Sequence, residues 1–208
     1  MDLSKATNPP ARQLPKARGF TIDGPYSRDL DDAIMVEGEP SGILCVSVTI
    51  AGVGIAVKAG TEADAKARER IATRYYPGGQ SSMLPRFLEE RLSLAEAERR
   101  ETVTITAKLE PHLELVEPPA LALTRFRSKA RLTYADVPRI LKDGAHQLHK
   151  TMVLAMRLAD GLLEQRRAAG AMVVYDLNQG WISTEEGHLK KGERREDWQG
   201  IIAGAQSW

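Results

Sequence analysis

Alternation of apolar and polar residues marks several segments of the chain as strands. From residue 43 to residue 50 every second side chain is apolar, and the pattern recurs from 102 to 109 with threonines on the opposite face. A period of two is typical of a half-buried strand. Similar runs predict strands over 113–117 and 121–128, and a hairpin within 173–182 that turns near residues 178–180.

Helix signals fall between these strand signals. Thr61 followed by Asp64 resembles a capping box and predicts a helix over 62–74, and Thr133 with Asp136 predicts another that ends near Gly144. Apolar residues recur at helical spacing over 146–169 and predict the longest helix. The mixture predicts an α+β domain with a mixed β-sheet flanked by helices.

Composition adds limits to this picture. The chain has 208 residues, a net charge of +1 and one cysteine, so an internal disulfide framework and a cysteine-rich metal site are excluded. A nucleic-acid partner would need a local basic groove, because the overall field is weak. The sequence has no apolar signal segment and no membrane-length apolar run, so we expect a cytoplasmic protein without membrane contact. The oligomeric state is left open, with a monomer favoured.

The first nineteen residues differ from the rest. They hold three prolines and four basic residues against one acid, which indicates a flexible arm or, alternatively, an arm that contacts phosphate. We therefore divide the chain into an arm over 1–19 and a catalytic-type domain over 20–208.

An acidic cluster carries the strongest chemical signal. Asp23, Asp29, Asp31 and Asp32 lie within ten residues, bracketed by apolar segments and interrupted by a Gly-Pro turn. Carboxylates placed this close repel one another and raise their pKa values, and a bound cation removes that cost. Oxygen ligands favour Mg²⁺, with Mn²⁺ as an alternative, and such ions assist phosphodiester cleavage. A solvated acidic turn is the other interpretation of the same spacing.

The wider sequence resembles the ribonuclease II family, which is defined by the RNB domain. The pattern Thr-Ile-Asp, five residues, then Asp-x-Asp-Asp-Ala over 21–33 resembles the family signature. Further blocks follow in family order: Val-Thr-Ile-Ala-Gly-Val over 48–53, Tyr-Tyr-Pro over 75–77, Met-Leu-Pro over 83–85, Leu-Ser-Leu over 92–94, Ser128, Arg131 and Tyr134, and Gly170-Ala171. The resemblance covers about residues 18–205.

The resemblance implies a hydrolytic, Mg²⁺-dependent 3′-to-5′ exoribonuclease that degrades single-stranded RNA to nucleoside 5′-monophosphates. By position, it implies that Asp23, Asp29 and Asp32 hold metal and that Asp31 serves catalysis. It also implies that Tyr75 packs near the RNA 3′ end, a role suited to an aromatic face.

The sequence departs from the family pattern in two respects. Thr49 and Gly52 replace the family's usual His and Asp, a change expected to alter strand packing beside the site. The chain ends at Trp208, before the block that supplies an active-site arginine in the family, so we expect a fragment of a longer nuclease.

Basic residues offer a path for RNA. Alternation places Arg125, Arg127, Lys129 and Arg131 on one face of a strand, and we take Arg125, Arg127 and Arg131 as candidate RNA-binding residues. An ordinary solvated face explains the same pattern. Two alternatives to a nuclease stay open: a non-catalytic RNA-binding relative or inactive fragment, and an interaction module with an acidic loop.

Overall fold

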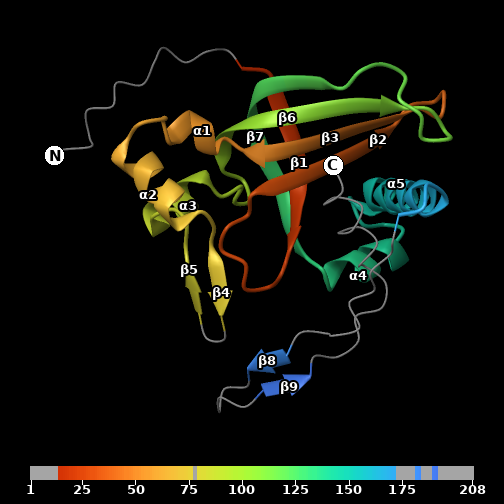
Figure 1. Cartoon of the computed structure of the whole chain (residues 1–208). Helices are drawn as coiled ribbons and strands as arrows, with labels where there is room; N and C mark the ends of the chain where they lie inside the picture. Colours follow the sequence, from red (N-terminus) through yellow and green to blue (C-terminus); the bar gives the residue numbers. More distant parts are fainter. Residues whose placement is uncertain (1–13, 77–78, 172–180, 184–188, 192–208) are drawn as a thin grey trace.

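Five strands form the centre of the molecule and close into a barrel in the order β1-β2-β3-β6-β7 (Figure 1). The computed structural model describes residues 14–76, 79–171, 181–183 and 189–191. The barrel strands are β1 (Lys16–Asp23), β2 (Asp32–Gly38), β3 (Leu44–Ala51), β6 (Arg99–Leu109) and β7 (Ala120–Thr133). The pairing of β1 with β7 is parallel, and the other pairings are antiparallel. The predicted mixed sheet flanked by helices is confirmed, with barrel closure as the added feature.

Closure depends on a close approach between β1 and β2. A Cβ atom at Gly19 would lie 2.7 Å from the carbonyl oxygen of Ile34 on β2, so only glycine fits on this backbone. The register between β1 and β7 also shifts between Gly19 and Thr21. A bulge of this kind bends a strand, which helps a sheet close on itself.

Helices and a small hairpin surround the barrel. The segment between β3 and β6 forms α1 (Val53–Ala56), α2 (Glu62–Arg70), a hairpin of β4 (Arg74–Tyr76) and β5 (Gly79–Ser81), and α3 (Arg86–Leu92). The segment after β7 forms α4 (Asp136–Lys142) and α5 (His149–Ala168), on the opposite side of the barrel in Figure 1. None of the helices in the described residues is long and apolar enough to cross a membrane.

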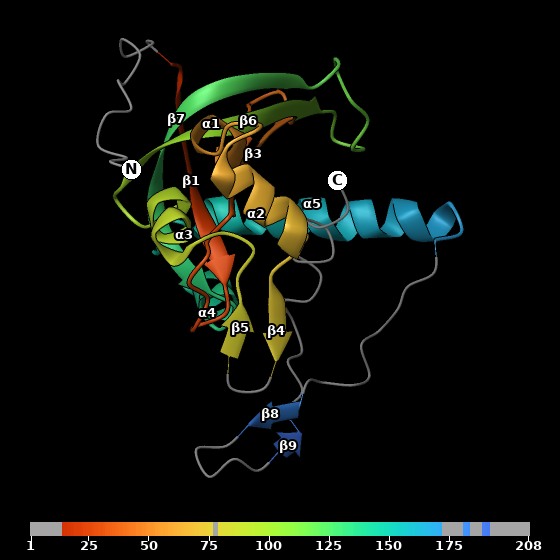
Figure 2. The same cartoon turned by 60° about the vertical axis from the view of Figure 1, so that its left-hand side comes forward.

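The outer face of the barrel packs against α5, which crosses β1 at a steep angle (Figure 2). Val36 and Val46 of the barrel pack with Ala155 and Leu158 of α5, and all four are buried. Phe20 packs with Met152 and with α4 in an adjoining cluster. The helix predicted over 146–169 is thus confirmed, and its apolar stripe forms core.

The opposite faces of β3, β6 and β7 turn into the barrel and carry hydroxyl groups. The Oγ1 atom of Thr104 lies 2.9 Å from that of Thr49 and 2.7 Å from that of Thr124, which in turn lies 2.7 Å from Thr102 Oγ1. All four threonines are buried. Hydroxyls can donate and accept at once, so the chain of bonds satisfies them without water.

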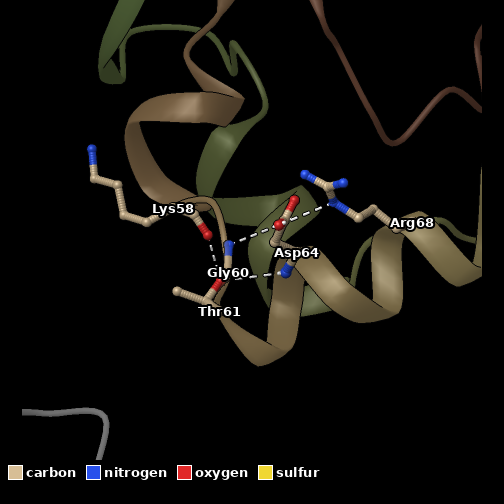
Figure 3. Close-up of polar contacts among 5 residues, drawn as sticks. All are labelled: Lys58, Gly60, Thr61, Asp64 and Arg68. Carbon is tan, nitrogen blue, oxygen red and sulfur yellow. Dashed lines mark hydrogen bonds and ion pairs between the residues drawn. The ribbon is translucent and has the colours of Figure 1, made fainter.

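The start of α2 confirms the predicted cap (Figure 3). The Asp64 backbone N–H donates to Thr61 Oγ1 at 3.3 Å, and the Asp64 carboxylate accepts the Gly60 N–H at 2.9 Å. The same carboxylate pairs with Arg68 one turn later, at 3.2 Å. The helix ends at Arg70, four residues before the predicted end.

The strand predicted over 113–117 is wrong. Leu113 has a φ of 69° and its N–H donates to Glu110 at 2.8 Å, so the chain turns sharply after β6. Of the segment only Leu115 forms a bridge, to Leu109. Leu113 packs beside Gly161 of α5, whereas Leu115 and Val116 are exposed, so the apolar pattern of this segment does not mark a buried face.

Two other predictions concern the ends of the chain. The predicted turn at 178–180 lies outside the described residues, whereas β8 (Trp181–Ser183) pairs with β9 (Leu189–Lys191). β1 begins at Lys16, so residues 16–19 of the predicted arm belong to the barrel. Residues 1–13 lie outside the described residues, and the division into arm and domain stays a prediction.

Candidate active site

The four aspartates lie at one end of the barrel. β1 ends at Asp23 and β2 begins at Asp32, and because these strands pair in opposite directions the two residues lie at the same end. Asp29 and Asp31 lie in the loop that joins the strands. The fold therefore gathers the residues that the sequence placed in one cluster.

Electrostatics within the cluster follow from burial and mutual repulsion. Partial burial, and then the charge of Asp32, raise the pKa of Asp23 to about 6, against a smaller opposing effect of Arg131. Partial burial raises the pKa of Asp31 as well, followed by the charges of Asp29 and Asp32. Burial also raises the pKa of Asp32. Among the described residues, the charge of Arg131 thus offsets the repulsion at Asp23 only in part.

The main chain of the loop is held firmly in spite of this repulsion. Ser93 Oγ accepts the Leu30 N–H at 3.1 Å and donates to the Arg28 carbonyl at 3.3 Å. The Leu94 N–H donates to the Leu30 carbonyl at 2.8 Å, and the Ala51 N–H to the Asp31 carbonyl at 2.8 Å. These bonds fix the backbone on which the aspartates sit.

Arg131 fastens the first part of the same loop. Its Nη2 atom donates to the carbonyl of Ser27 at 2.7 Å and to that of Pro25 at 3.5 Å. The guanidinium also acts on Asp23 through its charge, as noted above. Arg131 therefore lies at the site, but its observed bonds go to the protein backbone.

Tyr75 reaches the cluster from the hairpin of β4 and β5. Its hydroxyl donates to Asp29 Oδ2 at 3.1 Å while 69% of the residue is exposed. Partial desolvation, and then the bond to Asp29, raise the pKa of Tyr75. An exposed ring beside a carboxylate cluster can stack on a base while its hydroxyl orients an aspartate.

The other two candidate arginines lie farther along β7. Arg125 and Arg127 flank buried Phe126 on β7, but the register with β1 shifts between Ser128 and Arg131, so simple alternation does not carry on to Arg131. Arg127 Nε donates to the Ala97 carbonyl at 3.2 Å. At about 3.3 Å per residue, Arg125 is roughly 20 Å from Arg131 along the strand. Arg131 alone of the three is brought to the aspartates, and RNA binding by the three stays a prediction.

The donor set suits a hard divalent cation in chemistry and charge. Neighbouring carboxylates repel one another, and a bound ion such as Mg²⁺ would relieve that repulsion through oxygen ligands. Within the described part of the chain, however, no three His, Cys, Asp or Glu side chains converge closely enough to hold a metal ion. Cation binding here would therefore draw the carboxylates together on a backbone that is already fixed.

The two departures from the family pattern have structural explanations. Thr49 is buried and its hydroxyl joins the barrel network through Thr104. A Cβ at Gly52 would lie 2.4 Å from the carbonyl oxygen of Glu101, so this backbone leaves no room for an aspartate. Both changes thus fit the local packing beside the site.

Sequence reasoning missed three residues near the aspartates. Glu89 on α3 lies close enough for its charge to raise the pKa of Asp31 and of Tyr75, and its carboxylate accepts a bond from Ser82 at 3.1 Å. Ser93 appeared only as part of a sequence block, and its bonds to the loop carry no local pattern. Arg100 donates to the Ser93 carbonyl at 3.0 Å from β6.

The structure thus combines a closed five-stranded barrel with an aspartate cluster in the loop that joins two of its strands. The model of the RNB domain family matches residues 12–200. The chain belongs to the RNB domain family, in agreement with the resemblance found from its motifs.

Curated relatives carry the name Exoribonuclease 2. The protein from Psychromonas ingrahamii is 35% identical over 131 residues, which is 62% of this chain and 20% of that protein. The one from Actinobacillus succinogenes is 29% identical over 204 residues, or 91% of this chain and 31% of that protein. The chain thus spans less than a third of the length of these two relatives.

Solved structures share the fold. Mycoplasma genitalium RNase R in complex with ribose methylated single-stranded RNA superposes with a TM-score of 0.81 at 22% identity, over 92% of this chain and 31% of that chain. The Dss1 exoribonuclease of Candida glabrata gives 0.83 at 18% identity, over 93% and 28%. Yeast Ssd1, described as a pseudonuclease, gives 0.71 at 13% identity, over 93% and 24%.

Proposed function

We propose that this chain is part of a hydrolytic, Mg²⁺-dependent exoribonuclease that degrades single-stranded RNA in the 3′-to-5′ direction and releases nucleoside 5′-monophosphates. The observation that carries the proposal is the aspartate cluster, fixed on a bonded backbone at one end of the barrel, in which the pKa values of Asp23, Asp31 and Asp32 are raised. Uncompensated carboxylates are costly in a structural loop, and they are useful where a cation and a phosphate must meet.

The family and the names of its members supply the RNA part of the proposal. The chain matches the RNB domain, its curated relatives are named exoribonucleases, and an RNase R of the same fold is described in complex with single-stranded RNA. Tyr75 supports this substrate through its exposed aromatic ring at the edge of the site. We also propose that this activity is cytoplasmic.

Each residue has a distinct part in the proposed chemistry. Bound Mg²⁺ would activate water and offset negative charge at the phosphate. Asp23, Asp29 and Asp32 would hold the ion, Asp31 would assist the hydrolytic step, and Tyr75 would orient Asp29 and stack on the terminal base. Arg131 would keep the loop in place through the carbonyls of Pro25 and Ser27.

The test uses the full natural polypeptide and single-stranded RNA labelled at either end. With Mg²⁺, a 3′ label should appear at once as a mononucleotide, while a 5′ label should remain on RNA that shortens step by step. Chelation with EDTA should stop both, and Mg²⁺ should restore them. Internal cuts without mononucleotides, or hydrolysis unaffected by EDTA, would contradict the proposal.

A second candidate is an RNA-binding relative without catalysis. It is favoured by the separation of the carboxylates in the described residues and by the fold shared with a pseudonuclease. This candidate predicts RNA retention without turnover, and no rise in melting temperature on addition of Mg²⁺. A metal site should instead be stabilised by mass action.

A further inference from the structure

Ser93 contacts the aspartate loop at its centre. The serine ends α3, and its Oγ both accepts the Leu30 N–H at 3.1 Å and donates to the Arg28 carbonyl at 3.3 Å. Leu30 lies directly between Asp29 and Asp31. One hydroxyl therefore bonds the two peptide groups on either side of Asp29.

The surroundings make this contact rigid. Ser93 is 6% exposed, and the Leu30 and Leu94 side chains are buried together in a cluster with Phe126. The Leu94 N–H adds a bond of 2.8 Å to the Leu30 carbonyl. Water therefore has little access to replace the serine hydroxyl if it is removed.

Ser93 is itself held from the far side. Arg100 of β6 donates from Nε to the Ser93 carbonyl at 3.0 Å, and its Nη1 atom bonds Glu98 at 3.2 Å. The Ser93 N–H donates to the Glu89 carbonyl at 2.8 Å. The serine thus links the barrel and α3 to the loop between β1 and β2.

We infer that Ser93 is a positioning residue for the aspartate site, which sets the place of Asp29 relative to the other aspartates for a divalent cation through the peptide groups on either side of Asp29. The inference rests on the proposed function. Because the described carboxylates must come closer together to hold an ion, the position of their backbone controls how much of the binding energy is lost in rearrangement.

The experiment compares Ser93→Ala with a matched loss of hydroxyl elsewhere in the barrel. Ser47→Ala removes a half-buried hydroxyl that bonds Thr106 at 3.3 Å and makes no contact with the loop. For each protein the Mg²⁺ concentration at half-maximal RNA hydrolysis is measured in the full natural polypeptide, together with KM for RNA at saturating Mg²⁺. The rise in melting temperature caused by Mg²⁺ gives a readout without turnover.

Removal of a group that orients metal ligands typically weakens metal affinity or activity about 10–100-fold. We expect Ser93→Ala to raise the half-maximal Mg²⁺ concentration at least about tenfold, to leave KM for RNA unchanged, and to reduce the Mg²⁺-induced rise in melting temperature. Ser47→Ala should match the wild type in all three. If Ser93→Ala does not fold, Ser93→Cys preserves the volume with a weaker donor and is judged by the same measurements.

The outcomes separate the inference from the proposed function. An unchanged Mg²⁺ response in a folded Ser93 variant overturns the inference, even if its melting temperature without metal is lower. A wild-type protein that shows neither hydrolysis nor Mg²⁺ stabilisation overturns the proposed function, and the positioning role with it.

Discussion

The barrel interior and the aspartate loop each gather several polar side chains, but the interior groups are buried and neutral whereas the loop carboxylates are partly exposed and repel one another. In the interior, Thr49, Thr102, Thr104 and Thr124 satisfy one another through bonds of 2.7–2.9 Å without any charge. In the loop, the backbone is bonded at several points while the carboxylates repel, and the pKa of Asp23 rises to about 6. The difference indicates that neutral bonds build a stable frame, and that this frame supports carboxylates which repel one another.

A stability–function trade-off follows from this comparison. Residues that serve a site are often not the ones that would maximise stability. Loss of charge in the loop should therefore damage activity without damaging the fold, whereas loss of a hydroxyl in the interior should damage the fold. The following predictions are ordered from the largest expected effect to the smallest.

Asp31→Asn should give the largest effect, on activity alone. If Asp31 contributes several kcal/mol of charge stabilisation, RNA hydrolysis should fall roughly 1,000-fold, since each 1.4 kcal/mol is a factor of ten. The melting temperature should not fall, because the variant removes repulsion from Asp29 and Asp32. Single-turnover kinetics and thermal unfolding of the full polypeptide measure the two effects.

Asp160→Asn is the matched control for this variant, because Asp160 is exposed on α5 away from the loop. It should hydrolyse RNA at the wild-type rate. If Asp31→Asn hydrolyses RNA at the wild-type rate, Asp31 has no part in catalysis.

Thr124→Val should test the barrel interior. Valine has the shape of threonine, so the change removes bonds to Thr102 and Thr104 without leaving a cavity. A buried hydroxyl left without a partner costs about 1–3 kcal/mol, which urea unfolding can measure. Thr106→Val is the control: its 3.3 Å bond to Ser47 is only partly buried, so a smaller loss is expected. Equal losses of stability in the two variants would show that the buried threonine network stabilises the barrel no more than the partly buried bond does.

Asp23→Asn should stabilise the folded chain in a pH-dependent manner. The pKa of Asp23 is about 6 when folded and 3.8 in its ordinary state, so the folded chain binds a proton more readily between these values. The contribution of Asp23 to the free energy of unfolding is therefore greatest below pH 4 and falls as the pH rises to 6. Since the carboxyl is partly exposed, the gain above pH 6 from removing it is on the order of 1 kcal/mol.

Urea unfolding at pH 4 and pH 7.5 without metal checks this prediction. The variant should gain stability over the wild type at pH 7.5 and show little difference at pH 4. Asp160→Asn should change neither value. A variant that is less stable at pH 7.5 would mean that Asp23 has a stabilising partner, contrary to the repulsion that is offset only in part.

The sequence could predict the parts of the fold that repeat locally. Alternation identified β3, β6 and most of β7, and the capping residues Thr61 and Asp64 marked the start of α2. It could not predict the parallel pairing of β1 with β7, because a period of two fixes the face of a strand but not its neighbour. The hairpin of β4 and β5 was missed since three-residue strands show no periodicity.

The candidate site also contains features that local sequence could predict and others that depend on long-range contacts. The four aspartates are close in sequence and could be found from spacing and family resemblance. The contacts of Ser93 with Arg28 and Leu30 cross more than sixty residues and depend on packing. Arg131 could be named as a candidate from its strand, but its bonds to the loop carbonyls depend on where the loop turns.

Tyr75→Phe should give the smallest effect on stability and on RNA binding. It tests whether the loop is held by its backbone alone. The variant loses only the 3.1 Å bond from an exposed hydroxyl to Asp29, so stability should change by no more than about 0.5 kcal/mol. RNA binding should persist because the ring remains, whereas Tyr75→Ala should weaken it by about 1–3 kcal/mol if a base stacks there. Equilibrium binding of single-stranded RNA to the full polypeptide in the absence of metal measures both variants. If phenylalanine weakens binding as much as alanine does, the hydroxyl bond to Asp29, and not the ring, holds the RNA, and the aspartate loop then depends on a side-chain contact as well as on its backbone.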